Sequence, residues 1–250
     1  MTYSILAKDP ESGAIGIAVA SRFFACGALV PHIGRDVAVA TQAFVNPVWG
    51  TEGLRRLQAG EAADDVLADF VSRDAGHAQR QAHMMDADGR SATFTGGECV
   101  DWAGHTSGEG FSIAGNMLAG ADVIAETARV WKARDDLPFA ERLLAAMQAG
   151  EDAGGDKRGR QAAALCIHRG QEHPWLDLRV DDHGDPLSEL RRLLAVAQER
   201  YLIMADVLPT AERFSGLPDR REIDAKILAA EMKRAAEGGA TASFAKPAEG

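Results

Sequence analysis

Apolar residues are distributed along the chain in blocks of short strands separated by pairs of helices. The strand segments are runs rich in Ile, Val, Ala and Phe, with Gly residues or an Asp-Gly pair at their ends, which is the pattern of buried strands and hairpins. The first 43 residues are expected to hold four strands. The clearest strand segments are residues 2–8, 14–20, 37–41, 80–86, 90–95, 110–118, 161–168 and 175–180.

The segments between these blocks carry apolar residues at helical spacing. Asn46 before Pro47, and Asp185 before Pro186, are typical helix starts, because the polar side chain caps the first turn and Pro fits its first position. Helices are expected at residues 46–60, 61–73, 120–134, 138–149, 186–204 and 218–236.

This order of elements predicts an α+β fold. Strands that come in blocks do not alternate singly with helices, as they do in a doubly wound parallel fold. The order is consistent with two sheets that face each other, with helix pairs on the outside. We expect residues 1–205 to form one domain and residues 206–250 to add a C-terminal helix. Residues 237–250, rich in Ala, Gly and Pro, are expected to be a disordered tail.

Composition narrows the class of protein. The chain has 250 residues, of which 27 are basic and 37 acidic, so its net charge is −10. This charge disfavours nucleic acid or an anionic membrane surface as the main partner. The three cysteines are widely spaced and form no Cys-x-x-Cys pair. A disulfide framework or zinc site is therefore not expected, and the chain shows neither a membrane-length apolar run nor a leader pattern, which favours the cytoplasm.

The first strand carries the most informative chemistry. Thr2 follows the initiator Met1 directly. If Met1 is removed, Thr2 holds a hydroxyl nucleophile and a free α-amine that can serve as its base. Initiator Met is usually removed before a small residue such as Thr. The alternative is that Thr2 is only the first residue of a strand, and Ser4, on the same face, is a less favoured nucleophile.

A second candidate segment is the polar loop at 154–161. Its glycines permit unusual backbone angles, and Asp156 stands beside three basic residues. Asp156 could support the amine of a nucleophile, while Arg158 and Gln161 could position the amine or a substrate. The alternative is a solvated surface loop.

Two strand-to-helix junctions offer further polar groups. Gln42 and Asn46 stand at the first junction, where backbone N–H groups can form an oxyanion hole. The alternative for Asn46 is helix capping. Asn116 stands at the second junction, where it could donate to a substrate and orient the leaving group, or serve the turn alone.

Six segments together resemble a bacterial family designated domain of unknown function 1028. They are 2–7, 19–24, 40–47, 115–120, 154–161 and 178–186. The resemblance covers about residues 2–205. That family is placed among the N-terminal-nucleophile (Ntn) hydrolases, alongside proteasome β-subunits and penicillin acylases. The resemblance therefore implies a four-layer αββα sandwich with Thr2 as nucleophile and Asp156 as its supporting acid.

Departures from the proteasomal pattern disfavour proteolysis. Ala20 stands where proteasome subunits carry Asp, and the segment 28–35 contains no Lys. Hydrolysis of a small amide, without a metal or organic cofactor, is the function that the resemblance favours. The alternative is a non-catalytic protein on the same scaffold that binds a small ligand or takes part in an assembly. In either case we expect a homodimer whose ligand is a small molecule.

Overall fold

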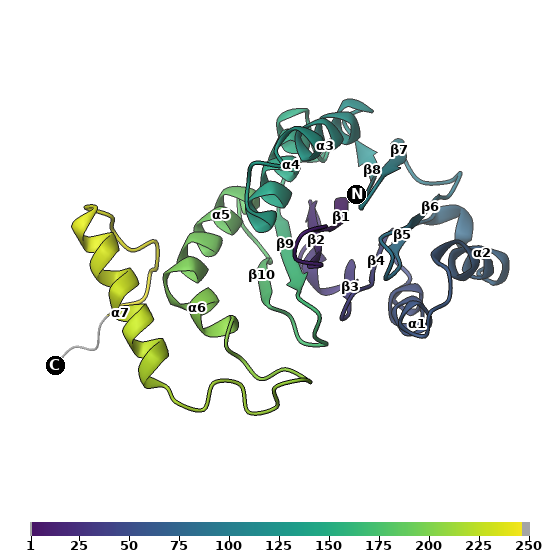
Figure 1. The fold of residues 1–250 in the computed structure, drawn as a ribbon. Coiled ribbons are helices and arrows are strands. Elements are labelled where there is room, and N and C mark those ends of the chain that lie inside the picture. Colours follow the sequence, from purple (N-terminus) through teal and green to yellow (C-terminus); the bar gives the residue numbers. More distant parts are fainter. Residues whose placement is uncertain (1, 247–250) are drawn as a thin grey trace. The chain divides into compact units, whose positions relative to one another are not determined.

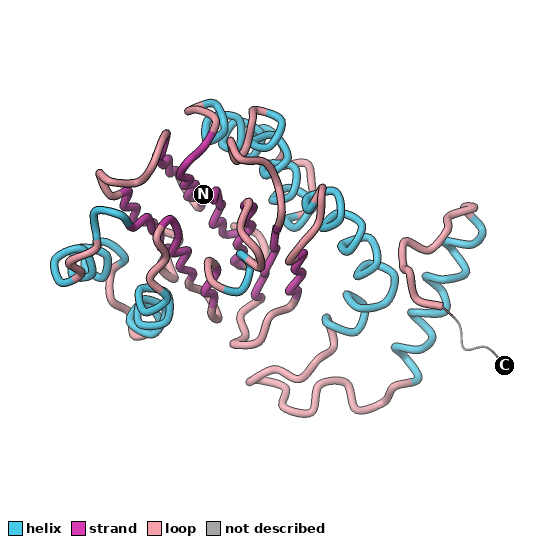
Figure 2. Tube along the Cα trace, turned by 180° about the vertical axis from the view of Figure 1, so that it is seen from behind, coloured by secondary structure: helices cyan, strands magenta, loops and turns pink. Residues whose placement is uncertain are grey.

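The computed structural model describes residues 2–246. Contacts within the chain divide it into a first unit that ends at Leu190 and a second that begins at Arg191. The sequence placed a boundary at residue 205 instead, after the helix expected at 186–204. Figure 1 shows the elements of both units, and Figure 2 shows the same chain from behind.

The first unit is built of mixed helices and strands, as expected. Its strands are β1 (Thr2–Lys8), β2 (Ile15–Ser21), β3 (Pro31–Ile33), β4 (Ala38–Ala43), β5 (Arg80–Met85), β6 (Ser91–Thr95), β7 (Trp102–Gly108), β8 (Phe111–Leu118), β9 (Ala162–His168) and β10 (Leu176–Val180). Its helices are η1 (Cys26–Ala28), α1 (Pro47–Gln58), α2 (Ala63–Arg73), η2 (His77–Gln79), α3 (Asp122–Ala133), α4 (Phe139–Asp152) and the start of α5 (Pro186–Val196).

The strands form two antiparallel sheets. A six-stranded sheet has the order β10-β9-β2-β1-β8-β7, and a four-stranded sheet has the order β3-β4-β5-β6. Strand β1 is therefore central in its sheet, with β2 and β8 as neighbours. The two sheets contact each other through β1 and β4 and through β5 and β8. This arrangement confirms the expected α+β class.

Helix pairs pack on both sheets. Helices α1 and α2 contact the four-stranded sheet, whereas α3 and α4 contact the six-stranded one, and the two pairs lie on opposite sides of the strands in Figure 1. A buried cluster between the sheets includes Leu6, Ile17 and Met85. A second cluster, between the four-stranded sheet and its helices, includes Trp49 and Phe70. Burial of this apolar surface is the main force that holds the layers together.

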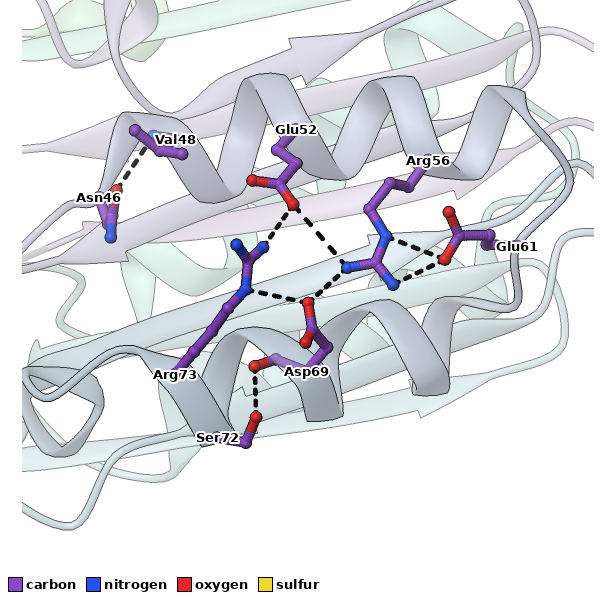
Figure 3. A network of polar contacts seen from close by, with 8 residues as sticks. All are labelled: Asn46, Val48, Glu52, Arg56, Glu61, Asp69, Ser72 and Arg73. Atoms are coloured by element: carbon purple, nitrogen blue, oxygen red, sulfur yellow. Dashed lines mark hydrogen bonds and ion pairs between the residues drawn. The ribbon is translucent and has the colours of Figure 1, made fainter.

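The start of α1 is the helix cap that the sequence predicted. The Asn46 side chain accepts a hydrogen bond from the Val48 N–H at 3.0 Å, and Pro47 occupies the first helical position. Ion pairs then join α1 to α2, as Figure 3 shows. Arg56 of α1 contacts Asp69 of α2 at 2.5 Å and also Glu61, in the turn between the helices, at 2.6 Å. The network lies at the surface, so it orients the helix pair and adds little stability.

The second unit begins within α5 and is helical. It continues through a π-helical turn, η3 (Ala197–Tyr201), into α6 (Leu202–Ala205), and later forms α7 (Arg221–Ala236). The sequence predicted one uninterrupted helix over 186–204. Of the expected tail at 237–250, residues 247–250 lie outside the described part. Within the described part, Thr241 and Ala242 both donate hydrogen bonds to the carboxylate of Glu199.

Strand β7 was not predicted. Its sequence, residues 102–108, shows no apolar alternation, because β7 is an edge strand that pairs only with β8 and leaves most side chains partly or fully exposed. Among residues 2–246, no helix combines the length and the apolar character needed to cross a membrane.

Candidate functional site

Strand β1 directs alternate side chains to the two faces of its sheet. Ser4 contacts Gln42 and His83 of the other sheet, whereas the hydroxyl of Tyr3 donates to the carbonyl oxygen of Met147 in α4 at 2.9 Å. Thr2 has the same parity as Ser4 and therefore belongs to the face between the sheets.

The hydroxyl of Thr2 has a second hydroxyl beside it. Thr2 Oγ1 lies 3.1 Å from Ser21 Oγ, the last residue of β2, and both side chains are buried. On its other side, Thr2 is paired with Asn116 of β8. Asn116 Nδ2 lies 3.4 Å from the Thr2 carbonyl oxygen. Thr2 is thus enclosed by polar groups from both neighbouring strands.

The glycine-rich loop places Asp156 at the same end of this sheet. The Ala119 N–H donates to the Gly155 carbonyl at 3.1 Å, and Leu118 forms a β-bridge with Asp156, so the loop lies along the end of β8. Gly154 has a φ of 113°, and a Cβ there would lie only 2.7 Å from that of Ala119. Only glycine permits both this backbone angle and this approach.

The carboxylate of Asp156 is buried and bound by backbone amides. Its Oδ2 accepts from the Arg22 N–H at 2.7 Å, and its Oδ1 accepts from the Arg158 N–H at 2.8 Å. The Arg158 guanidinium lies 3.4 Å from Oδ2 as well. Because Arg22 follows Ser21 directly, Asp156 holds the strand end that carries the Ser21 hydroxyl. Asp156 is thus linked to Thr2 through the Arg22 amide and the neighbouring Ser21 hydroxyl.

A buried amide network extends from this point between the sheets. The Gln81 Nε2 atom faces the carbonyl oxygens of Gly115, at 2.8 Å, and Gly104, at 3.2 Å. Because carbonyl oxygens only accept, this end of Gln81 must be its NH2 group. Its Oε1 then accepts from Gln42 Nε2 at 2.9 Å and from Asn116 Nδ2 at 3.0 Å. Backbone geometry thus determines the orientation of all three amides.

The same logic fixes the protons of a Ser-His-Ser chain. Gln42 Oε1 accepts from the Ser4 hydroxyl at 2.8 Å, which uses the only proton of Ser4. Ser4 Oγ must then accept from His83 Nε2–H at 2.9 Å, and His83 Nδ1 accepts from Ser112 Oγ at 2.9 Å. Burial lowers the pKa of His83 to about 3, so its ring is neutral. In this arrangement His83 Nε2 carries a proton, so it cannot serve as the base for Ser4.

A pocket of about 250 Å³ opens at the ends of β4 and β8. It is lined by Ala43, Phe44, residues 98–100, Asn116 and Met117, together with Gln79. Ala43 and Met117 both have left-handed backbones, with φ of 68° and 53°. Such strain in residues other than glycine is costly and is concentrated at functional sites. Thr2 is not among the lining residues, and its paired neighbour Asn116 connects it to the pocket.

Cys99 lines this pocket but is poorly suited to nucleophilic attack. Its Sγ donates to the Arg80 carbonyl oxygen at 3.4 Å, and burial raises the pKa of its thiol. The thiolate is the reactive form, so a raised pKa disfavours nucleophilic attack by Cys99.

Two other hollows lie away from Thr2. One, of about 270 Å³, surrounds the start of α1 and includes Asn46 and Asp74. The other, of about 580 Å³, is lined by three hairpin turns and includes Lys8. Lys8 ends strand β1 whereas Thr2 begins it, so this larger hollow is at the opposite end of the strand.

The structure gathers part of the predicted site and separates the rest. Thr2, Gln42, Asn116, Asp156 and Arg158 lie in one connected region of hydrogen bonds and strand pairs, described above.

Asn46 and Gln161 have other partners. The side chain of Asn46 bonds to Val48 and to Asp74, the capping role that was its alternative. Gln161 Nε2 donates to Asp182 at 3.1 Å, in an exposed contact. Asn116 was expected to donate to a substrate, but its two N–H groups are directed at Thr2 and Gln81.

The sequence did not single out Ser21 or Gln81 as site residues. Ser21 could have been found from the hairpin register, since Tyr3 pairs with Ala20 and Thr2 therefore faces Ser21. Gln81 carried no such signal, because its side-chain partners belong to four other strands, β4, β6, β7 and β8. Among residues 2–246, no group of three or more His, Cys, Asp and Glu residues is arranged to hold a metal ion.

Comparisons with known proteins agree with the expected family. The model of a family of unknown function, DUF1028, matches residues 2–190. Protein SPO2555 from Silicibacter pomeroyi, whose crystal structure is described under the same family, is 34% identical, with a TM-score of 0.79 over 86% of this chain and 98% of that one. Comparison with curated proteins gives no match. The chain therefore belongs to the DUF1028 family of unknown function.

Proposed function

We propose that this protein is an amidohydrolase of the N-terminal-nucleophile type, which cleaves a small C–N bond on a four-layer αββα scaffold. The position of Thr2 carries the proposal. Thr2 begins the central strand, and its hydroxyl lies 3.1 Å from that of Ser21, at the end of the sheet that also holds Asn116 and Asp156. A hydroxyl with an α-amine on the same residue forms a self-contained nucleophile and base.

The reaction takes two steps once Thr2 is the first residue. The α-amine accepts the proton of Oγ1 while Oγ1 bonds to the amide carbon, and the carbonyl π electrons move to oxygen. Collapse of this intermediate breaks the C–N bond, and the amine passes its proton to the leaving nitrogen. Water, deprotonated by the same amine, then hydrolyses the ester and restores Thr2. General base catalysis of this kind contributes about 10²–10⁴ in rate.

The neighbouring residues have distinct roles in this proposal. Ser21 Oγ, which lies 3.1 Å from Thr2 Oγ1, donates a hydrogen bond to the developing oxyanion in this proposal. The Phe44 N–H, near the expected oxyanion hole at 42–46, already donates to the Gln79 carbonyl. Asp156 is a positioning residue, since it holds the Arg22 amide next to Ser21. Arg158, bonded to Asp156 and to the Arg22 carbonyl, supports the same strand end.

Removal of Met1 is essential to this mechanism, because an amide nitrogen on Thr2 is not a base. Met1 itself lies outside the described residues. The second candidate is binding of a small ligand without catalysis. The observation that favours it is the pocket beside Asn116, which has no Thr2 among its lining residues.

Mass spectrometry and kinetics together test the proposal. Protein made in its own host is expected to lack Met1, and the processed protein is then screened against a library of small amides. Thr2→Ala is expected to lower the rate at least about 10²-fold, whereas Thr2→Ser keeps a nucleophile and retains activity. Thr51→Ala, an exposed threonine on α1, is the matched control. Retained Met1, or a Thr2→Ala variant as active as the parent, would refute the hydrolase.

A further inference from the structure

The pocket at the ends of β4 and β8 presents a hydrogen-bond acceptor from an almost fully buried residue. Asn116 is 1% exposed, and its Nδ2 group donates to Gln81 and to Thr2. Its Oδ1 has no partner among the described residues. Every enclosed side-chain nitrogen and oxygen of these residues is hydrogen-bonded, so Oδ1 must be the accessible part of Asn116. Because Asn116 lines the pocket, this carbonyl oxygen is available to a ligand there.

Other polar side chains of the pocket also offer acceptors. Glu98 is exposed and is the only charged side chain among the described lining residues. Its Oε2 accepts from Gln79 Nε2 at 3.2 Å, which leaves the side-chain oxygen Oε1 of Gln79 for a ligand. Arg80, whose guanidinium lies over the Phe44 ring, forms an ion pair with Asp74 at 3.2 Å. The pocket therefore combines one negative charge with several acceptors.

An exposed aromatic face completes this chemistry. Phe44 lines the pocket and is 66% exposed. The Arg80 guanidinium lies 4.7 Å from the ring centre, which shows that the ring already accepts a cation. Aromatic faces attract ammonium groups through their quadrupole. Val100, 58% exposed, adds an apolar wall for a short alkyl chain.

We propose that this pocket binds the ammonium group of a small organic cation, so that the substrate class is an amide that carries a primary amine. The proposal rests on the proposed function. An ammonium has three donors and no acceptor, which matches Asn116 Oδ1, the Glu98 carboxylate and Gln79 Oε1. A carboxylate at the same place would face these acceptors beside the negative charge of Glu98. A volume of about 250 Å³ restricts the ligand to a few carbons.

Binding of three matched amides to the processed Thr2→Ala protein tests this inference. N-acetylputrescine is cationic, N-butylacetamide is neutral, and N-acetyl-γ-aminobutyrate is anionic, with similar chain lengths. Calorimetry is expected to show the cation bound at least about 10-fold more tightly than the neutral amide, and the anion more weakly than both. Because the variant has no nucleophile, this result does not depend on whether hydrolysis occurs.

Substitutions of exposed acids locate the charge. Glu98→Gln is expected to weaken binding of the cation about 5- to 10-fold and to leave the neutral amide unchanged. Glu109→Gln, an exposed acid at the opposite end of the sheets, is the control and is expected to change neither. Equal affinity for cation and neutral amide, tighter binding of the anion, no binding of any of the three, or an unchanged Glu98→Gln variant would each overturn the assignment.

Discussion

Replacement of Gln81 by Glu tests whether the buried amide network has the proton positions derived above. Gln81 is fully buried, and its Nε2 group faces the carbonyl oxygens of Gly104 and Gly115. Gln81→Glu replaces this NH2 group by an oxygen of nearly the same size. An ionised carboxylate would face two carbonyl oxygens without a proton, whereas a protonated one can donate to either of them. The native state therefore strongly favours the protonated acid, and the pKa of the introduced carboxyl group must rise.

The size of the effect follows from linkage. A free Glu side chain titrates near about 4.3, and a buried one reaches about 8–9. A pKa raised in the native state makes stability fall as pH increases from the unfolded value toward the native one. The slope is about 1.4 kcal/mol per pH unit, so the loss relative to the parent reaches about 3.7 kcal/mol at pH 7. For a chain of this size, this corresponds to a fall in Tm of about 7–15 °C.

Urea denaturation of the variant and the parent between pH 4.5 and 8 measures this difference. Near pH 4.5 the two proteins are expected to be similar, and the gap should widen with one-proton slope as pH rises. Gln79→Glu, an exposed glutamine two residues earlier, is the matched control, and its effect is expected to stay within about 1 kcal/mol. A Gln81→Glu deficit that is independent of pH, or below about 1 kcal/mol at pH 7, would show that Gln81 has the opposite orientation.

Three further predictions concern other buried groups. His83 has a pKa of about 3 in the native state, below its unfolded value of about 6.5, so the free energy of unfolding falls as pH drops. Between pH 6.5 and 5 the parent is expected to lose about 2 kcal/mol for this reason, and denaturant titrations of His83→Gln should show that this loss is absent. Gly150→Ala places a Cβ 2.3 Å from Thr127 Oγ1 and should cost about 1–3 kcal/mol by calorimetry, whereas Gly184→Ala meets nothing within 4 Å and should be neutral. Tyr3→Phe removes the hydroxyl bonded to the Met147 carbonyl and should cost about 1–2 kcal/mol in urea, a figure that an unchanged midpoint would contradict.

Local signals in the sequence were sufficient for most of the fold. The strand predicted at residues 2–8 is β1, and the cap predicted at Asn46 is formed by its side chain. Both features depend on residues that are close together in the chain: the strand on apolar alternation and the cap on an Asn-Pro pair. They can therefore be predicted from the sequence alone. Strand β7 depends instead on pairing with β8, because its own residues are mostly polar or small, and the sequence did not reveal it.

The candidate site was harder to predict because its residues meet across sheets. Thr2 and Asp156 were expected at one site, and the structure places both at the same end of the six-stranded sheet. Gln81 links Gln42 and Asn116 only because the two sheets stack face to face. Which strand of one sheet lies over which strand of the other depends on packing of the whole core, and no local pattern encodes it.

The orientation of the buried amides determines which atom of Asn116 faces the pocket. The carbonyl groups of Gly104 and Gly115 orient Gln81, and Gln81 Oε1 then holds the NH2 group of Asn116 away from the pocket. The pocket therefore owes its acceptor character to backbone groups that do not line it. With Gln81→Leu, the Asn116 amide would keep only the long 3.4 Å contact with Thr2 and could turn over. Its NH2 group would then enter the pocket and disfavour an ammonium ligand, so a residue remote from the ligand would change specificity.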